Sequence, residues 1–391
     1  MSETTMSPSE MGEVPASHGS SGPLGSSGAS ASLGAAGCSA SAGSAASAGA
    51  GHHVARATMK DVAALSGVSL KTVSRVVNRE AGVSPEVRER VERAVARLDY
   101  SHNVHASNLR RSSGRTGTVG ALLQDISNSF SASLLRSLED VARDQRTAVL
   151  ASSLDEEPER EIALVRGLVA RRVDGLVLMP ATARQEYLLP ELRAGLPTVF
   201  VDRLPRGVDA DSVTVDNLAG SRHAVRHLVS HGHRRIVALG DLRTIQTAEL
   251  RLQGYREEMQ AAGLGDEILE RADLRTPEAA EAAVRQLFRT GTGPRPTAIF
   301  AGRNDLAVGA VRALRALGLV HRVALVGFDD FPLADLLDPG LTVMRQNVGQ
   351  IGSEVGRLLF ARIDGDAAPP RRVVIEPTLI PRGSGEIPPH E

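Results

Sequence analysis

The sequence predicts a protein of two parts, a small all-α domain near the N-terminus followed by a larger α/β core built as two lobes. Three helix-start signals lie close together within residues 57–102. From Thr118 onward, short apolar runs alternate with helical periods, as in parallel sheets whose faces are covered by helices. The length of 391 residues is sufficient for two or three domains with substantial cores.

The small domain is predicted from capping residues and one glycine turn. Thr58 and Ser69 each precede a helical period, and Ser84 is followed by proline in the cap-then-proline order that starts a helix. Gly67 breaks the first period, because glycine readily adopts the positive φ of a tight turn. The expected helices cover residues 59–65, residues 70–78 and a segment that opens at Ser84-Pro85.

The second helix has distinct inner and outer faces. Val73, Val76 and Val77 recur at helical spacing and are expected to face inward, which leaves the outer face to Leu70, Lys71, Ser74 and Arg75. Two helices joined by a short glycine-containing turn form a helix-turn-helix, whose second helix fits the DNA major groove.

Charge supports this interpretation. Residues 57–115 hold eleven Lys/Arg and six Asp/Glu, about +5, whereas the whole chain has a net charge of −1. A basic module on a near-neutral protein favours phosphate contact. The alternative is a solvated helical bundle with no role in nucleic-acid binding.

The first 56 residues are rich in Ser, Gly and Ala, and we expect them to be disordered because they have little apolar surface to bury. They lack the basic start and apolar run of a signal peptide, and no stretch of the chain has eighteen consecutive apolar residues. Cys38 is the only cysteine, which excludes disulfides within the chain and cysteine-based zinc sites. These features predict a cytoplasmic protein.

Polar residues follow several of the predicted strands of the core. In open α/β sheets, ligands bind beyond the carboxyl ends of the strands. Carboxylates, amides and an arginine gathered there suit a hydroxyl-rich or otherwise polar small molecule. The alternative for each single residue is a helix cap. The residues concerned are Asp125, Asp202-Arg203, Arg303-Asn304-Asp305 and Asp329-Asp330, with Arg251 early in a predicted helix.

Other chemistry has little support in the sequence. The histidines at 223, 227, 231 and 233 are interpreted as helix-face and loop residues rather than metal ligands. No glycine-rich loop stands between a strand and a helix, and no nucleophile or paired carboxylates stand in a catalytic pattern. We therefore predict no metal, no cofactor and no enzymatic activity.

The run DVAALSGVSLKTVSRVVN, followed by VSPEVRERV and LDY, resembles the lactose-repressor/galactose-repressor (LacI/GalR) family of bacterial transcription regulators. Further motifs of the core look similar to the same family in the same order, including DISNSF, RRVDGLVL, RLQGY, RNDLAVGA, VALVGFDD and LTVMRQNV. The resemblance covers about residues 57–383.

The resemblance implies a periplasmic-binding-protein-like core that the chain crosses three times. It implies a homodimer on pseudo-palindromic double-stranded operator DNA, whose affinity changes when an effector binds between the lobes. The implied parts are a tail at 1–56, the helix-turn-helix domain at 57–102, a hinge helix and linker at 103–116, an N-lobe at 117–215 and 345–374, a C-lobe at 216–344 and 375–383, and a second tail at 384–391. The short C-terminal end has no heptads, so a tetramerising coil is not expected.

By the same resemblance, Leu70 and Lys71 contact base edges, and neighbouring residues contact bases or phosphates. In the hinge, Leu109 and Ala106 share one face, so paired Leu109 side chains would enter a minor-groove step; the alternative is a plain linker. His102 stands where the family usually has proline. The full implied set for DNA is Ser69, Leu70, Lys71, Thr72, Ser74, Arg75, Asn78, Tyr100, Asn103, Ala106 and Leu109.

Seven core residues match the effector-contacting positions of the family: Asp125, Phe130, Asp202, Arg251, Asn304, Asp329 and Gln346. Ser129 and Ser131 flank Phe130 where the family often has proline and a second aromatic residue. A sugar is the expected effector, with a phosphorylated sugar, a nucleoside or another polar metabolite as alternatives. The competing function is a solute-binding protein for a transporter, which would require an export signal and no DNA-reading helices.

Overall fold

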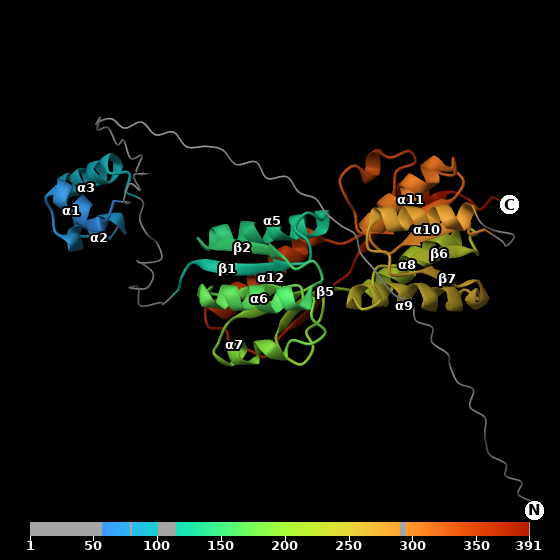
Figure 1. The fold of residues 1–391 in the computed structure, drawn as a ribbon, viewed down its shortest axis with the longest axis horizontal. Helices are drawn as coiled ribbons and strands as arrows, with labels where there is room; N and C mark the ends of the chain where they lie inside the picture. Colours follow the sequence, from blue (N-terminus) through green and yellow to red (C-terminus); the bar gives the residue numbers. More distant parts are fainter. Residues whose placement is uncertain (1–56, 79, 101–114, 290–294, 391) are drawn as a thin grey trace, which may run out of the picture. The chain divides into compact units, whose positions relative to one another are not determined.

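The computed structural model describes residues 57–78, 80–100, 115–289 and 295–390. The chain divides into two compact units, residues 1–100 and residues 101–391 (Figure 1). The expected N-terminal tail and the expected hinge helix lie outside the described residues.

The first unit contains three helices, α1 (Met59–Ser66), α2 (Leu70–Val77) and α3 (Pro85–Arg97). Two predicted caps are present, since Ser69 Oγ accepts from Thr72 N at 3.2 Å and Ser84 Oγ accepts from Val87 N at 3.5 Å. Thr58 is arranged differently: its backbone N–H and its hydroxyl both donate to the Asp61 carboxylate. The helices enclose a small apolar core of Val62, Val73, Val76, Val91 and Ala94.

The second unit contains two six-stranded sheets. The N-lobe sheet has the order β11-β5-β4-β3-β1-β2, and every neighbouring pair in it is parallel. Two helices cover one face, and one helix with a short helical turn-and-helix segment covers the other. The strands are β1 (Thr118–Leu123), β2 (Ala148–Ser153), β3 (Leu176–Leu178), β4 (Thr198–Val201), β5 (Asp211–Val215) and β11 (Arg372–Ile375); α5 (Ser129–Asp144) and α12 (Val348–Ile363) lie on the first face, and α6 (Pro158–Ala170) and α7 (Leu189–Arg193) on the second.

The C-lobe sheet has the order β12-β10-β9-β8-β6-β7, in which only the β12 pair is antiparallel. Its strands are β6 (Ile236–Leu239), β7 (Leu269–Arg271), β8 (Ala298–Ala301), β9 (Ala324–Phe328), β10 (Thr342–Arg345) and β12 (Thr378–Ile380). Helices α8 (Asn217–Ser230) and α9 (Gln246–Ala261) cover one face, and α10 (Pro277–Arg289) and α11 (Asn304–Ala316) cover the other. The chain thus passes between the lobes after β5, after β10 and after β11.

The C-terminal segment differs from the tail expected at 384–391. Ser384 Oγ donates to the Leu325 carbonyl at 2.6 Å and accepts from Thr342 N at 2.9 Å. Ile387 O bonds to the buried His233 ring at 2.8 Å. Because these bonds satisfy buried polar groups of the C-lobe, the segment through Ile387 belongs to that lobe, and the expected boundary at residue 383 was too early.

The apolar runs predict strands at residues 119–123, 148–151, 175–179, 198–201, 235–239, 298–301 and 324–327, and a strand is present at each. Five further strands were not predicted: β5, β7, β10, β11 and β12. Three of them, β7, β11 and β12, are edge strands of only three or four residues with partly exposed side chains. In the part of the chain that the structure describes, every helix is too short or too polar to span a bilayer.

Candidate functional site

The outer face of α2 carries the side chains that were predicted to read DNA. Leu70 is 42% exposed, and Lys71 and Arg75 are also exposed. On the opposite face Val73 and Val76 are buried and hold the helix against α1 and α3. The helix therefore presents an aliphatic side chain and two cations to solvent on a firmly packed support.

Several other residues predicted for DNA contact have hydrogen-bond or packing partners within the small domain. Thr72 Oγ1 bonds to Ser69 Oγ at 2.9 Å, and Asn78 Nδ2 donates to Ser74 Oγ at 3.2 Å. Tyr100 is half-buried and packs against the small apolar core. The hinge residues Asn103, Ala106 and Leu109 lie outside the described residues.

A cleft lies between the lobes, where the carboxyl ends of the strands of both sheets meet. Its inner part is a small cavity of about 40 Å³. Six of the seven residues predicted for effector contact line it: Phe130, Asp202, Arg251, Asn304, Asp329 and Gln346. The topology therefore brings together side chains that are as much as 216 positions apart, from Phe130 to Gln346.

Asp125 is the exception among the seven and does not line this cavity. Its carboxylate accepts from Ser127 N at 2.8 Å and from Ser127 Oγ at 2.7 Å, which closes a local turn after β1. The preceding residue, Gln124, lines the cavity instead. Both residues lie beyond the end of β1, and of the two only Gln124 lines the inner cavity, so effector contact by Asp125 stays a prediction.

Arg251, which is 6% exposed, is the centre of the inner cavity's hydrogen bonds. It donates to Asn217 Oδ1 at 2.7 Å, to the Gly302 carbonyl at 2.8 Å and to Asp329 Oδ2 at 3.2 Å. Its guanidinium also stacks on the Phe328 ring, 3.9 Å from the ring centroid. The second oxygen of Asp329 accepts from the Gln346 amide. Arg251 and Asp329 are therefore a fixed buried pair.

Arg203 belongs to a second pair across the cavity. It donates to both oxygens of Glu156 and to the Pro180 carbonyl. Asp202 is 3.6 Å from Arg203 Nε, and burial raises the pKa of the Asp202 carboxyl above its ordinary value. Because Arg203 is bonded mainly to Glu156, the Asp202 carboxylate keeps acceptor capacity for a ligand.

Arg303 is paired as well, with Asp241 and Asp305. Beside it the two lobes touch directly. Asn128 Nδ2 donates to Asn304 Oδ1 at 3.1 Å, and Asn304 Nδ2 donates to Ser129 Oγ at 3.0 Å. These amide and hydroxyl bonds connect the start of α5 in the N-lobe to the start of α11 in the C-lobe.

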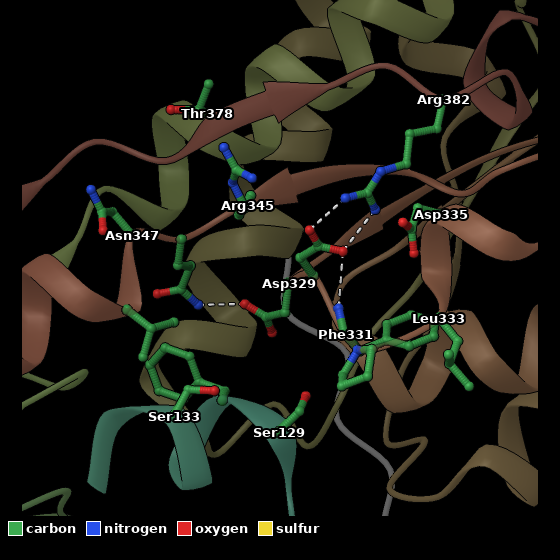
Figure 2. A pocket seen from close by; sticks show the side chains of 15 residues that line it. Ser129, Ser133, Asp329, Phe331, Leu333, Asp335, Arg345, Asn347, Thr378 and Arg382 are labelled. Atoms are coloured by element: carbon green, nitrogen blue, oxygen red, sulfur yellow. Dashed lines mark hydrogen bonds and ion pairs between the residues drawn. The ribbon is translucent and has the colours of Figure 1, made fainter. Parts of the chain in front are cut away.

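A larger cavity of about 520 Å³ adjoins the inner one and shares Phe130, Asp329 and Gln346 with it. Figure 2 shows it bounded on one side by the start of α5, which contributes Ser129 and Ser133. The other side is formed by Arg345 of β10, Thr378 of β12 and Arg382, which comes two residues after β12 ends. Arg382 holds the Asp330 carboxylate in two bonds of 2.7 Å (Figure 2). The interlobe cleft is therefore wide on this side and narrow at the polar centre around Arg251 and Asp329.

Charge decides which ligands suit the inner cavity. All three arginines that line it, Arg203, Arg251 and Arg303, already face carboxylates. The lining also contains Asp202, Asn304 and Gln346, and Gln346 Oε1 is buried without a hydrogen-bond partner among the described residues. Such a surface offers acceptors and amides to hydroxyl groups and holds no uncommitted cation for a phosphate.

The sequence interpretation missed several lining residues. Gln124, Asn128, Met179, Arg203, Asp241 and Arg303 line the inner cavity with the residues named above. Arg203 and Arg303 had been noted at strand ends but not as lining residues. Met179 directly follows β3 and Asp241 comes two residues after the end of β6, so the strand-end rule was capable of finding both.

The histidines of α8 and the following turn have structural partners. His227 Nε2 is hydrogen-bonded to Glu386, and its ring lies 4.5 Å from that of His231. His233 is fully buried between Thr297 and Ile387, and burial lowers its pKa. Within the described ranges, no group of three or more His, Cys, Asp or Glu side chains is arranged to hold a metal ion.

A three-helix domain with an exposed recognition helix, joined to a two-lobed core with a polar cleft, defines a DNA-binding transcriptional regulator of the ligand-responsive kind. Comparison with known families agrees: residues 58–103 match the model of bacterial regulatory proteins of the lacI family, and residues 225–385 match the periplasmic binding protein-like domain. The chain belongs to the lacI family of bacterial regulatory proteins. The predicted family and fold class are confirmed.

The matches to individual relatives cover nearly the whole length of each relative. The ribose operon repressor of Escherichia coli (strain K12) is 32% identical over 335 residues, covering 84% of this chain and 99% of the relative. The transcriptional regulator CelR of Thermobifida fusca is 34% identical over 343 residues, covering 84% and 98%. Both relatives are regulators by name, and the alternative of a transporter's solute-binding protein is not supported.

Solved structures show the same architecture. The lac repressor dimer bound to operator and the anti-inducer ONPF is 26% identical, with a TM-score of 0.74, covering 85% of this chain and 99% of the other. The complex of the regulator CelR with cellobiose is 33% identical, with a TM-score of 0.59, covering 84% and 100%.

Proposed function

We propose that this protein is a cytoplasmic, homodimeric repressor that is released from operator DNA, or recruited to it, by a neutral polyhydroxylated effector of the sugar class. The observation that carries the effector assignment is the paired state of Arg203, Arg251 and Arg303 beside the buried carboxylate of Asp202. The names of relatives support it, since they include a ribose operon repressor and a complex with cellobiose.

Recognition of a sugar follows from the chemistry of the lining. Asp202 and Gln346 offer acceptor oxygens, and Asn304 offers both a donor and an acceptor, so hydroxyl groups in either role find partners. A phosphorylated sugar would bring negative charge next to Asp202 and Asp329. Rejection of such a ligand is expected because the unpaired charge would be desolvated.

The mechanism requires movement of the lobes. The inner cavity, about 40 Å³, holds only a few water molecules, so a sugar ring enters only when the lobes separate. Separation breaks the bonds of Asn304 to Asn128 and Ser129. It also breaks two further bonds between the lobes, from Leu204 N to the Gln246 side chain and from Arg275 to the Asp155 carbonyl, each of 2.8 Å. A ligand that binds one lobe arrangement better shifts operator affinity by its coupling free energy, typically about 1–3 kcal/mol.

For the DNA-reading part, we propose that α2 enters the major groove with Leu70 and Lys71 on base edges, Ser69, Thr72, Ser74 and Arg75 on bases or phosphates, and Asn78 and Tyr100 supporting backbone contacts. The exposure of Leu70 and Lys71 on the face of α2 opposite its buried valines supports this. We also propose that the hinge residues Asn103, Ala106 and Leu109 contact the minor groove between the half-sites.

The decisive experiment compares neutral and phosphorylated sugars on one preparation. Thermal shift and titration calorimetry with D-ribose, cellobiose and D-ribose 5-phosphate, followed by band-shift assays on an operator selected from random duplexes, test the proposal. We expect at least one neutral sugar to bind and to change operator affinity, and Asp202→Asn to weaken that binding at least tenfold. Preferential binding of D-ribose 5-phosphate, or chemical turnover of any of the sugars, would contradict the proposal.

A further inference from the structure

Helix α12 connects the ligand cleft to the point where the linker from the DNA-reading domain enters the core. Its N-terminal end follows Gln346 directly, and Asn347 caps it by accepting from Gln350 N at 3.1 Å. Gln346 lines both cavities of the cleft and is bonded to Asp329. With 16 residues, α12 extends about 24 Å away from the cleft.

The other end of α12 holds Arg115. One Nη atom of Arg115 donates to the Ile363 carbonyl, in the last turn of the helix, and the other is 2.9 Å from Asp364 Oδ1 at the helix C-cap. A cation at this position also complements the negative end of the helix dipole. Arg115 lies three residues before β1, so the C-terminal end of α12 is bonded to the chain just before it enters the N-lobe sheet.

A second clamp prevents the entering chain from moving separately from the sheet. The Asp174 carboxylate accepts from Thr116 N and Gly117 N at 2.6 Å each, and from Thr118 N at 3.3 Å. Residues 115–118 are therefore fixed on one side by α12 and on the other by the turn before β3. A displacement that α12 shares with the N-lobe sheet therefore moves this short segment as well.

Helix α12 is also positioned to move together with α5. A Cβ on Gly352 would collide with Ser137 Cβ of α5, and a Cβ on Gly356 would lie 2.8 Å from Val141 Cγ1. The two helices thus pack with their backbones close together, and both have their N-terminal ends at the cleft, where α5 contributes Ser129 and Phe130. Close-packed interiors transmit displacement instead of deforming.

We infer that α12 is the mechanical connection between effector cleft and DNA linker, and that Arg115 is the positioning residue through which α12 sets the entry of that linker. The inference rests on the regulator function proposed above but not on the identity of the effector. The bonds of Arg115 to Ile363 and Asp364 join the C-terminal end of α12 to the chain just before β1.

A double-mutant cycle without any ligand tests the inference. Gln346→Glu places a second carboxylate beside Asp329 and perturbs the cleft end of α12, whereas Arg115→Gln releases the other end. We expect Gln346→Glu to change operator affinity at least threefold in the wild-type background. In the Arg115→Gln background the change is expected to fall below 1.5-fold, and Arg115→Lys, which keeps the charge, is expected to restore part of it.

The control variant is Arg312→Gln, which removes an exposed ion pair with Glu278 on the C-lobe and should leave the effect of Gln346→Glu unchanged. Melting temperatures of all variants identify any that fail to fold, and Gln346→Ala replaces Gln346→Glu in that event. An equal effect of the cleft substitution with and without Arg115 would overturn the inference, and so would no effect in the wild-type background. Failure of every sugar to bind would contradict the proposed effector class but leave this cycle interpretable.

Discussion

Replacement of Arg251 by alanine is expected to destabilise the core strongly as well as to abolish the response to effector. Arg251 makes three hydrogen bonds of 2.7, 2.8 and 3.2 Å, and its removal takes one donor from each of Asn217 Oδ1, the Gly302 carbonyl and Asp329 Oδ2. The Asp329 carboxylate keeps its bond to the neutral Gln346 amide but loses its buried cation. Breaking a buried ion pair by deleting one partner costs about 3–5 kcal/mol, because the other charge stays buried and uncompensated. For a core of this size that corresponds to a fall in melting temperature of about 10 °C.

The measurement is thermal unfolding by calorimetry on two Arg251 variants and one control. Arg251→Lys keeps a charge opposite Asp329 but cannot reach all three acceptors, so its melting temperature is expected to lie between those of wild type and Arg251→Ala. Arg312→Ala deletes an arginine whose side chain is 51% exposed and should shift melting by no more than about 2 °C. An Arg251→Ala melting temperature within that same margin would refute the description of Arg251 and Asp329 as a fixed buried pair.

Three further predictions concern other parts of the molecule. In band shifts at several salt concentrations, Lys71→Ala is expected to lower operator affinity by about 1–3 kcal/mol, and Leu70→Ala to relax base preference at one position; no change in specificity for either would contradict major-groove reading by α2. Burial lowers the pKa of His233, so below pH 6.5 the unfolded chain binds a proton on this ring more readily than the folded chain does. Stability that is present above pH 6.5 is therefore lost as the pH falls. The variant His233→Gln should show a smaller drop in melting temperature between pH 7 and pH 5 than the wild type. Gly352→Ala should cost about 1–3 kcal/mol by overpacking α12 against Ser137, and an unchanged melting temperature would show that the two helices are not in close contact.

Much of the architecture was predictable because it depends on local chemistry. The caps at Ser69 and Ser84 are visible in four-residue windows, and both form the expected bonds. The strands β3, β4, β8 and β9 are continuous apolar runs that a buried parallel strand requires. Edge strands such as β7 and β12 were missed because a partly exposed strand is stabilised by its neighbour rather than by its own pattern.

The candidate site was predictable in its residue types but not in their pairing. The rule that ligands bind beyond strand ends placed Asp202, Arg251 and Asp329 in one region, and the resemblance to a known family named the same residues. Only the structure shows that Arg251 is bonded to Asp329 while Arg203 turns to Glu156, which leaves Asp202 available. Such choices among neighbouring charges depend on distances of a few ångströms that sequence separation does not encode.

The sequence by itself determined the class of this protein, because periodicity, caps and motif order are properties of the chain read in one dimension. The tertiary structure decided what the class leaves open: which charges in the cleft are neutralised, that Gln124 rather than Asp125 lines the inner cavity, and that Arg115 is bonded to the far end of α12. The physical reason is that electrostatic and packing energies depend on distance in space, and the fold brings Arg115 and Asp364 within 2.9 Å although 249 positions separate them.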